Sequence, residues 1–246
     1  MCGRFTQRRD PSEIAQIFGA DLADDDLTGE RYNVAPTDRV TVVVERDDRR
    51  LVEAHRWGLV PSFAADPSGA ARLINARAET VHSTPAFRTA FARRRCIVPA
   101  DGFYEWQRRG RVSQPYLIRP PDGSGIALAG LWSVWREQGS DQWLRSCAVV
   151  TTAANRLVAE LHDRMPVIVP PEAWAAWLDP TLAGSALSPL LRPAPEQSLE
   201  LVPVSRRVND PRCEGPDLVV PIELSPERST EPEHRSLWGA PGRDPV

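Results

Sequence analysis

Cys2 is the residue whose position in this chain best suits covalent chemistry. It directly follows Met1, so removal of Met1 would leave an α-amine and a thiol on adjacent carbon atoms. The reference pKa values of these two groups are about 7.7–8.0 and about 8.5, so both are partly deprotonated near neutral pH. With an aldehyde, the amine forms a Schiff base and the sulfur then closes a five-membered thiazolidine ring. The alternative is that Cys2 is an ordinary residue of a frayed terminus.

The absence of lysine strengthens the case for the N-terminal amine. All 30 residues in the Lys+Arg count are arginines. An arginine side chain stays protonated and does not act as an amine nucleophile. Amine-based covalent chemistry in this chain therefore needs the N-terminus.

Two other side chains are suited to proton transfer. Glu105 lies in the aromatic segment 101–106, where burial would raise its pKa into the range of general acid–base catalysis. His162 lies between a predicted helix and a predicted strand, and histidine titrates near neutral pH. The alternatives are an outward-facing strand glutamate and a capping or packed histidine. The remaining histidines lack a comparable setting and are predicted to be surface or packing residues: His55, His82 and His234.

An amide and a guanidinium lie two residues apart in the segment 73–80. Asn75 and Arg77 alternate there with apolar residues, so their side chains share one face if the segment is extended. This pair suits an anion such as a phosphate. The alternative is a solvated arginine.

Composition limits the remaining function classes. A chain of 246 residues with 41% hydrophobic and 26% charged residues is typical of a soluble globular protein. No apolar run approaches the roughly 20 residues of a membrane span, and no signal segment follows Met1, so a cytoplasmic protein without a membrane partner is expected. The net charge of −3 does not by itself indicate nucleic acid, although the acidic segment 21–26 can mask a basic face. The cysteines lack metal-ligand spacing, so we expect no metal and no other cofactor: Cys2, Cys96, Cys147 and Cys213.

Many short strands and a few short helices must position these side chains. This pattern predicts a single α+β domain with a β-barrel-like sheet core over residues 1–222, and residues 223–246 are predicted to be a disordered tail. The segment 31–37 is polar, contains Pro36, and is not expected to lie in a strand. Strands are predicted at 40–45, 51–56, 96–99, 102–107, 116–119, 126–135, 143–151, 164–169 and 199–204, and helices at 11–18, from Thr84-Pro85 to the basic run 93–95, at 155–161 and at 171–178.

Seven separate segments of distinctive sequence occur along the chain in a fixed order. They are Met-Cys-Gly-Arg-Phe at the start, Arg-Tyr-Asn-Val-Ala-Pro-Thr at 31–37, Trp-Gly-Leu-Val-Pro at 57–61, Ile-Asn-Ala-Arg-Ala-Glu-Thr at 74–80, Ala-Asp-Gly-Phe-Tyr-Glu-Trp at 100–106, Leu-His-Asp-Arg-Met-Pro at 161–166 and Pro-Val-Ser-Arg-Arg-Val-Asn at 203–209. In these segments the chain resembles the SRAP family, the SOS response-associated peptidases or abasic site processing proteins. The resemblance covers about residues 1–222.

The resemblance implies a monomeric protein whose partner is single-stranded DNA that contains abasic sites. Cys2 would form a thiazolidine crosslink with the ring-opened sugar, and Asn75 would contact that sugar. Glu105 would transfer protons during crosslinking, Met1 removal and crosslink reversal, and His162 would assist ring opening. AP-lyase-like activity would fit the same site.

The DNA-binding residues that the resemblance implies are Arg4, Arg77, Phe63, Trp106 and Thr151, with part of the run 93–95 as a further candidate for phosphate contact. This chain departs from the family where relatives carry one or two tryptophans after the Trp-Gly-x-x-Pro element. It has Phe63-Ala64 there, so stacking on DNA bases would use one ring.

Two other functions also fit the sequence. One is an N-terminal-cysteine peptidase limited to autocatalytic removal of Met1. The other is a single-stranded DNA-binding module that makes no covalent bond and in which Cys2 is incidental.

Overall fold

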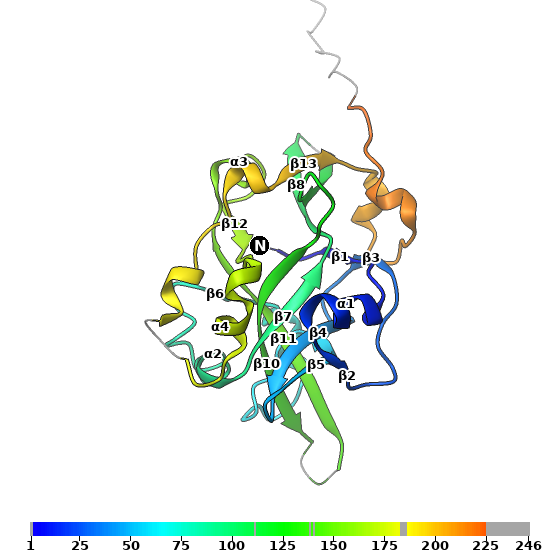
Figure 1. Cartoon of the computed structure of the whole chain (residues 1–246). Coiled ribbons are helices and arrows are strands. Elements are labelled where there is room, and N and C mark those ends of the chain that lie inside the picture. The colour runs from blue at the N-terminus through cyan, green and yellow to red at the C-terminus, as the bar shows by residue number, and fades with distance from the viewer. Residues whose placement is uncertain (1, 111, 138, 140, 183–185, 225–246) are drawn as a thin grey trace, which may run out of the picture.

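A closed barrel of five strands forms the centre of the computed structural model, which describes residues 2–110, 112–137, 139, 141–182 and 186–224 (Figure 1). The barrel strands are β4 (Arg39–Arg46), β5 (Arg49–Trp57), β7 (Arg95–Ala100), β10 (Ile126–Arg136) and β11 (Trp143–Ala153). Neighbouring strands are antiparallel in the order β11-β10-β7-β4-β5, and a parallel pairing of β11 with β5 closes the ring. The predicted α+β class and β-barrel-like core are confirmed.

A second, five-stranded sheet places the N-terminal strand beside the barrel. Its order is β13 (Glu200–Pro203), β9 (Val112–Arg119), β8 (Gly102–Arg109), β1 (Phe5–Gln7) and β3 (Arg31–Val34). The chain segment just after Cys2 therefore lies between β8, which carries Glu105, and β3. Three short strands extend the barrel sheet: β2 (Asp21–Leu22) beside β5, and β6 (Asn75–Arg77) and β12 (Arg164–Pro166) beside β11.

The strand β3 corrects one prediction. The segment 31–37 lacks alternating apolar residues, yet Arg31–Val34 pairs with Phe5–Gln7. Tertiary pairing overrides local propensity here, because the neighbouring strand supplies the hydrogen-bond partners.

Within the described residues, four α-helices flank the two sheets: α1 (Pro11–Phe18), α2 (Arg88–Arg93), α3 (Arg156–Ala159) and α4 (Trp174–Leu178). The α1 helix matches its predicted bounds because Asp10 caps its first turn and Gly19, with φ 59°, ends it. The α2 helix starts later than predicted, since Thr84 lies in a preceding turn and its hydroxyl donates to the Thr80 carbonyl. Short 3₁₀ segments lie at Ser68–Arg72, Pro171–Ala173, Ser188–Leu190, Glu196–Ser198, Arg206–Asn209 and Pro216–Val219.

Two hydrophobic clusters occupy opposite faces of the barrel wall. The interior cluster includes Cys2, Trp57, Cys147 and Val149. The exterior cluster joins residues of α1, α2 and α4 to the outward-facing residues of the wall. The Cys2 side chain therefore belongs to the barrel core, as a buried and free thiol.

The barrel interior also holds a hydrogen-bonded histidine–glutamate pair that the sequence pattern does not suggest. His55 Nε2 lies 2.9 Å from Glu53 Oε2, and both side chains are fully buried. Of the two environments predicted for His55, packing is therefore confirmed. Burial lowers the pKa of His55, and the neighbouring carboxylate of Glu53 opposes that change.

The loop from β5 to β6 delivers Asn75 to the N-terminal strand. Gly58 has a φ of 130°, and a Cβ atom there would lie 2.7 Å from the Ala70 carbonyl oxygen. Only glycine accommodates this close approach. The Leu59 amide then donates to the Leu73 carbonyl at 3.1 Å, which joins the two ends of the loop just before β6 begins.

Candidate functional site

The buried N-terminal segment places Cys2 at the centre of the site. The Cys2 side chain is fully buried, and Phe5 behind it packs edge-on against Trp57 with ring centroids 4.9 Å apart. The Tyr104 amide donates to the Arg4 carbonyl at 2.9 Å, which ties this segment to β8. Burial raises the pKa of the Cys2 thiol well above its ordinary value, and the negative charge of Glu105 raises it further. The thiol is therefore protonated near neutral pH.

Asn75 contacts Cys2 directly. Its Nδ2 donates to the Cys2 carbonyl oxygen at 2.8 Å. Parallel pairing of β6 with β11, Asn75 opposite Val149, fixes the side chain in this position. The Asn75 Oδ1 atom is buried and has no hydrogen-bond partner within the described part of the chain. A bound molecule could therefore donate a hydrogen bond to Asn75 Oδ1.

Glu105 is a buried acid beside the nucleophile. Its side chain is 3% exposed and lies in β8, opposite Tyr116 of β9. Burial raises the pKa of Glu105 to about 7, and the negative charge of Asp163 adds to this increase. At neutral pH this carboxyl group is therefore present in both protonation states, as a proton-transfer group requires.

His162 has two neighbours at the same ring nitrogen. Its Nδ1 lies 2.9 Å from the Arg164 amide nitrogen and 2.8 Å from Asp163 Oδ1. The two contacts belong to different protonation states, because an unprotonated Nδ1 accepts from the amide whereas a protonated one donates to the carboxylate. Burial lowers the pKa of His162, so the neutral ring bound to the amide dominates near neutral pH. That ring carries its proton on Nε2.

Asp163 links His162 to Glu105 electrostatically. Its charge raises the pKa of both groups. Glu105 and His162, predicted from separate segments, thus share one charged neighbour, and the charge of Glu105 in turn acts on Cys2. The structure brings Cys2, Asn75, Glu105 and His162 into one site.

Arg77 and Thr151 lie next to this site on paired strands. Arg77 is exposed in β6 opposite Thr151 in β11. Thr151 is fully buried, and its carbonyl oxygen accepts from Arg164 Nη2 at 2.7 Å. Arg164 also forms a two-point ion pair with Glu79, at 2.7 and 2.9 Å. Thr151 therefore anchors Arg164, and Arg77 presents a solvent-facing guanidinium.

The other DNA-binding candidates differ in their surroundings. The Arg4 guanidinium lies 5.8 Å from the ring centroid of Trp106, whose Nε1 donates to Asn209 Oδ1 at 2.7 Å. Phe63 is 70% exposed on the loop between β5 and β6. In the basic run 93–95, Arg95 is buried and donates to backbone carbonyls, including that of Trp177 at 2.7 Å, so it is not available to a phosphate.

Three residues near the site were missed by the sequence analysis as candidates: Asn33, Asp163 and Arg164. Each lies inside a segment that carries the family resemblance, so membership of a motif was the available signal. Their roles depend on contacts between distant segments, which spacing does not reveal. The described residues contain no group of three or more His, Cys, Asp or Glu side chains that could hold a metal ion. None of the helices within these residues is long and apolar enough to cross a membrane.

Comparison with solved structures places this fold among known ones. A Bacteroides thetaiotaomicron protein superposes with a TM-score of 0.81 at 24% identity, covering 90% of this chain and all of that protein. A Bordetella bronchiseptica protein superposes with a TM-score of 0.71 at 26% identity, covering 83% of this chain and all of that protein.

Sequence relatives align with most of this chain. The abasic site processing protein YoqW of Bacillus subtilis is 35% identical over 222 residues, which are 89% of this chain and 99% of the relative. YedK of Escherichia coli, named in the same way, is 31% identical over 90% of this chain and 100% of its own. HMCES of Gallus gallus, also named so, is 32% identical over 78% of this chain and 66% of its own. The model of the SOS response associated peptidase (SRAP) family matches residues 1–211, and the chain belongs to this family.

Proposed function

We propose that this protein processes abasic sites in single-stranded DNA by forming a covalent crosslink through Cys2. The observation that carries the proposal is the hydrogen bond from Asn75 to the Cys2 carbonyl, made beside a buried carboxyl group with a pKa of about 7. An aldehyde-trapping site needs a nucleophile, a proton shuttle and a group that orients the sugar. The names of the relatives, abasic site processing proteins, supply the substrate class.

The first step is removal of Met1, which frees the Cys2 amine. Hydrolysis of the Met1–Cys2 peptide bond consumes one water molecule and releases methionine. Glu105 is the acid–base group placed to assist this step, because its charge already acts on Cys2. Removal of Met1 would account for the word peptidase in the family's description without a foreign peptide substrate.

The second step is capture of the sugar. His162, whose Nδ1 accepts from the Arg164 amide and whose proton is on Nε2, assists opening of the cyclic hemiacetal to the aldehyde through Nε2. The Cys2 amine attacks the aldehyde carbon to give a carbinolamine, which loses water to form an imine. Glu105 donates the proton that lets the hydroxyl group leave. Asn75 Oδ1 accepts a hydrogen bond from a sugar hydroxyl.

The third step closes the ring. The Cys2 sulfur adds to the imine carbon, and the thiol proton ends on the nitrogen, so crosslinking releases one water molecule overall. Because burial keeps the thiol protonated, the amine reacts first and a base must take the thiol proton as the carbon–sulfur bond forms. The carboxylate form of Glu105 provides that base.

DNA reaches this site along cationic and aromatic groups that are exposed or partly exposed. Arg77 contacts a backbone phosphate next to the lesion, and Arg4 contacts another. Phe63 and Trp106 offer ring faces to neighbouring bases, and the buried Thr151 holds Arg164 in place beneath the strand.

The test is incubation of the protein with two single-stranded oligonucleotides of one sequence, abasic and intact, followed by a denaturing gel. A slower band only with the abasic strand supports the proposal. Binding to both strands in a native gel without a covalent band would indicate the non-covalent module instead. Methionine release without any DNA-dependent band would indicate a peptidase limited to its own N-terminus.

A further inference from the structure

Asn33 is a fully buried polar residue in β3 that the proposed chemistry does not use. Its amide makes contacts in two directions. Oδ1 accepts from Arg4 Nη1 at 2.7 Å, and Nδ2 donates to the carbonyl oxygens of Asp210 and Cys213, each at 3.0 Å. The orientation of the amide is fixed, because Arg4 can only donate and the two carbonyls can only accept.

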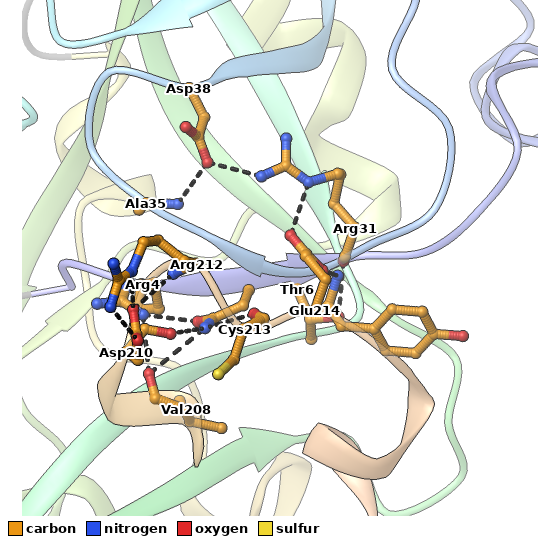
Figure 2. Close-up of polar contacts among 12 residues, drawn as sticks. Arg4, Thr6, Arg31, Ala35, Asp38, Val208, Asp210, Arg212, Cys213 and Glu214 are labelled. Atoms are coloured by element: carbon orange, nitrogen blue, oxygen red, sulfur yellow. Dashed lines mark hydrogen bonds and ion pairs between the residues drawn. The ribbon is translucent and has the colours of Figure 1, made fainter. Parts of the chain in front are cut away.

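Arg4 is held by this amide and by the segment that the amide binds. Its Nη1 also donates to the Val208 carbonyl oxygen at 2.9 Å. Figure 2 shows Arg4 beside Val208 and Asp210, with the segment 208–214 wrapped against the strand that carries Arg31. At the far end of this segment, Glu214 accepts from Arg31 Nε and from the Tyr32 amide, both at 2.8 Å. We name residues 208–214 the clasp.

One edge of the Arg4 guanidinium is fully hydrogen-bonded within the protein. Both hydrogens on Nη1 are used, by Asn33 and by Val208. The Cζ atom of Arg4 lies 5.8 Å from the ring centroid of Trp106. The Trp106 indole is held in turn, because its Nε1 donates a hydrogen bond to Asn209 of the clasp. A long side chain with many rotamers is thereby fixed in one position next to the Cys2 segment. Fixing an arginine before binding removes the entropic cost of ordering it on a phosphate.

We propose that Asn33 is a positioning residue that orients Arg4 for a DNA phosphate and acts on the DNA only through Arg4. This inference rests on the proposed function, since it assigns Arg4 to the single strand at the same site. Asn33 does not itself touch DNA, because its side chain is fully buried. The two residues therefore form one functional unit, with Asn33 holding and Arg4 binding.

The experiment measures non-covalent binding to a single strand that carries a tetrahydrofuran abasic analogue, which has no aldehyde and cannot crosslink. Affinity is followed against salt concentration for the parent, Arg4→Ala, Asn33→Ala and the double variant. Arg4→Ala should weaken binding by about tenfold, as expected for a hydrogen bond to a charged group. It should also reduce the slope of log K against log salt by about 0.7. Asn33→Ala should give most of both effects, and the double variant should be no worse than Arg4→Ala.

Two further variants separate positioning from simple loss of structure. Asn33→Asp keeps an oxygen for Arg4 and removes the donors to the clasp, so it should retain more affinity than Asn33→Ala. Glu214→Gln removes the ion pair between the clasp and Arg31 and leaves the Asn33–Arg4 bond in place, so the salt slope should stay at the parent value. Thermal unfolding of each variant confirms that the protein measured is folded.

The inference is overturned if Asn33→Ala and Asn33→Asp both bind DNA with the affinity and salt slope of the parent. It is also overturned if the double variant loses affinity by the product of the losses in Arg4→Ala and Asn33→Ala. Equal losses of DNA affinity in Asn33→Asp and Asn33→Ala would also overturn it. The affinity would then depend on the hydrogen bonds from Asn33 to the clasp and not on the contact with Arg4. Failure of the proposed function looks different, because the parent itself would then form no adduct with an abasic strand.

Discussion

The side-chain amide of Asn75 donates a hydrogen bond of 2.8 Å to the backbone carbonyl of Cys2. These residues are far apart in sequence, and β6 brings them together only because it pairs with β11 at the edge of the barrel. The bond fixes the backbone of the nucleophile, while the second amide atom, Oδ1, is left for a ligand. Asn75 thus connects the fold to the chemistry that we propose.

Replacement of Asn75 by Asp should slow adduct formation by about 10²–10³-fold, as for loss of one oriented hydrogen-bond donor near a reacting centre. The carboxylate keeps the shape of the amide but cannot donate to the Cys2 carbonyl. The measurement is the rate of band appearance on a denaturing gel at saturating abasic DNA. Affinity for the tetrahydrofuran analogue serves as the control and should change much less. An unchanged rate would show that the Cys2 contact is dispensable.

Cys2 variants should separate binding from covalent capture. Cys2→Ala should abolish the gel-stable adduct and leave non-covalent binding close to that of the parent, because the phosphate contacts lie on other residues. Cys2→Ser should also lose the ring-closed product, since an oxygen-containing ring is more labile than a thiazolidine. Intact mass spectrometry of the parent should give a chain that begins at Cys2. A heat-stable serine adduct in normal yield would contradict the proposed ring closure.

The stability of the protein should reveal the buried state of Glu105. Its folded pKa, about 7, is above the ordinary value, so the folded chain binds a proton that the unfolded chain releases. Stability should therefore be fully present below about pH 4.5 and decline as pH rises through 7, by on the order of 3 kcal/mol at most. Glu105→Gln removes this titration. Urea unfolding at pH 5 and pH 8.5 should show a smaller decline for the glutamine variant, whereas an equal decline would place Glu105 in solvent.

The elements that could be predicted from sequence were those set by local pattern. The hairpin of β4 and β5 follows from two apolar segments separated by polar residues, and a tight turn joins the strands at Asp47 and Asp48, with φ values of 54° and 56°. The helix α1 follows from Asp10, Pro11 and Gly19. The hairpin and the helix α1 depend on residues close together in the chain, so the sequence alone predicts them.

The parts that could not be predicted depend on contacts between distant segments. The strand β3 owes its existence to pairing with β1, and Asn33 within it is bonded to a segment more than 170 residues away. The closure of the barrel by β5 and β11 has no local signature either. The four residues proposed for the chemistry were candidates from their types and settings, and the family resemblance gave them roles, but their proximity in space emerged only from the fold. The predicted tail from residue 223 lies almost wholly outside the described residues.

Arg77 should contribute one phosphate contact to DNA binding. Its guanidinium is exposed in β6, two residues beyond Asn75, so a strand bound at the site passes over it. Arg77→Ala should reduce the slope of log K against log salt by about 0.7, the value for one phosphate on a single strand. Arg49→Ala is the matched control, because Arg49 is also exposed and lies at the start of β5, paired with Asp21. Equal slopes for Arg77→Ala and the parent would remove Arg77 from the interface.

Glu105 and His162 should control different stages of one reaction. His162 assists opening of the sugar ring, which precedes attack by the amine, so His162→Ala should slow adduct formation more than adduct release. Glu105 shuttles protons while the carbinolamine dehydrates and while the sulfur adds to the imine, and the same transfers occur in reverse during release. Glu105→Gln should therefore slow both directions, each by about 10²–10⁴-fold, the range typical of a positioned proton-transfer group.

Two time courses on an abasic single strand measure these effects. One follows appearance of the adduct, and the other follows its loss to a competing aldehyde trap. Asp163→Asn is a useful third variant, because it removes the carboxylate that holds the protonated ring of His162 while leaving the Arg164 amide in place. Asp163→Asn should slow adduct formation most at low pH, where His162 is protonated and its Nδ1 donates to the carboxylate of Asp163. If Glu105→Gln leaves both rates within about threefold of the parent, well below the expected range, then Glu105 is a buried strand residue and the proton shuttle must be another group.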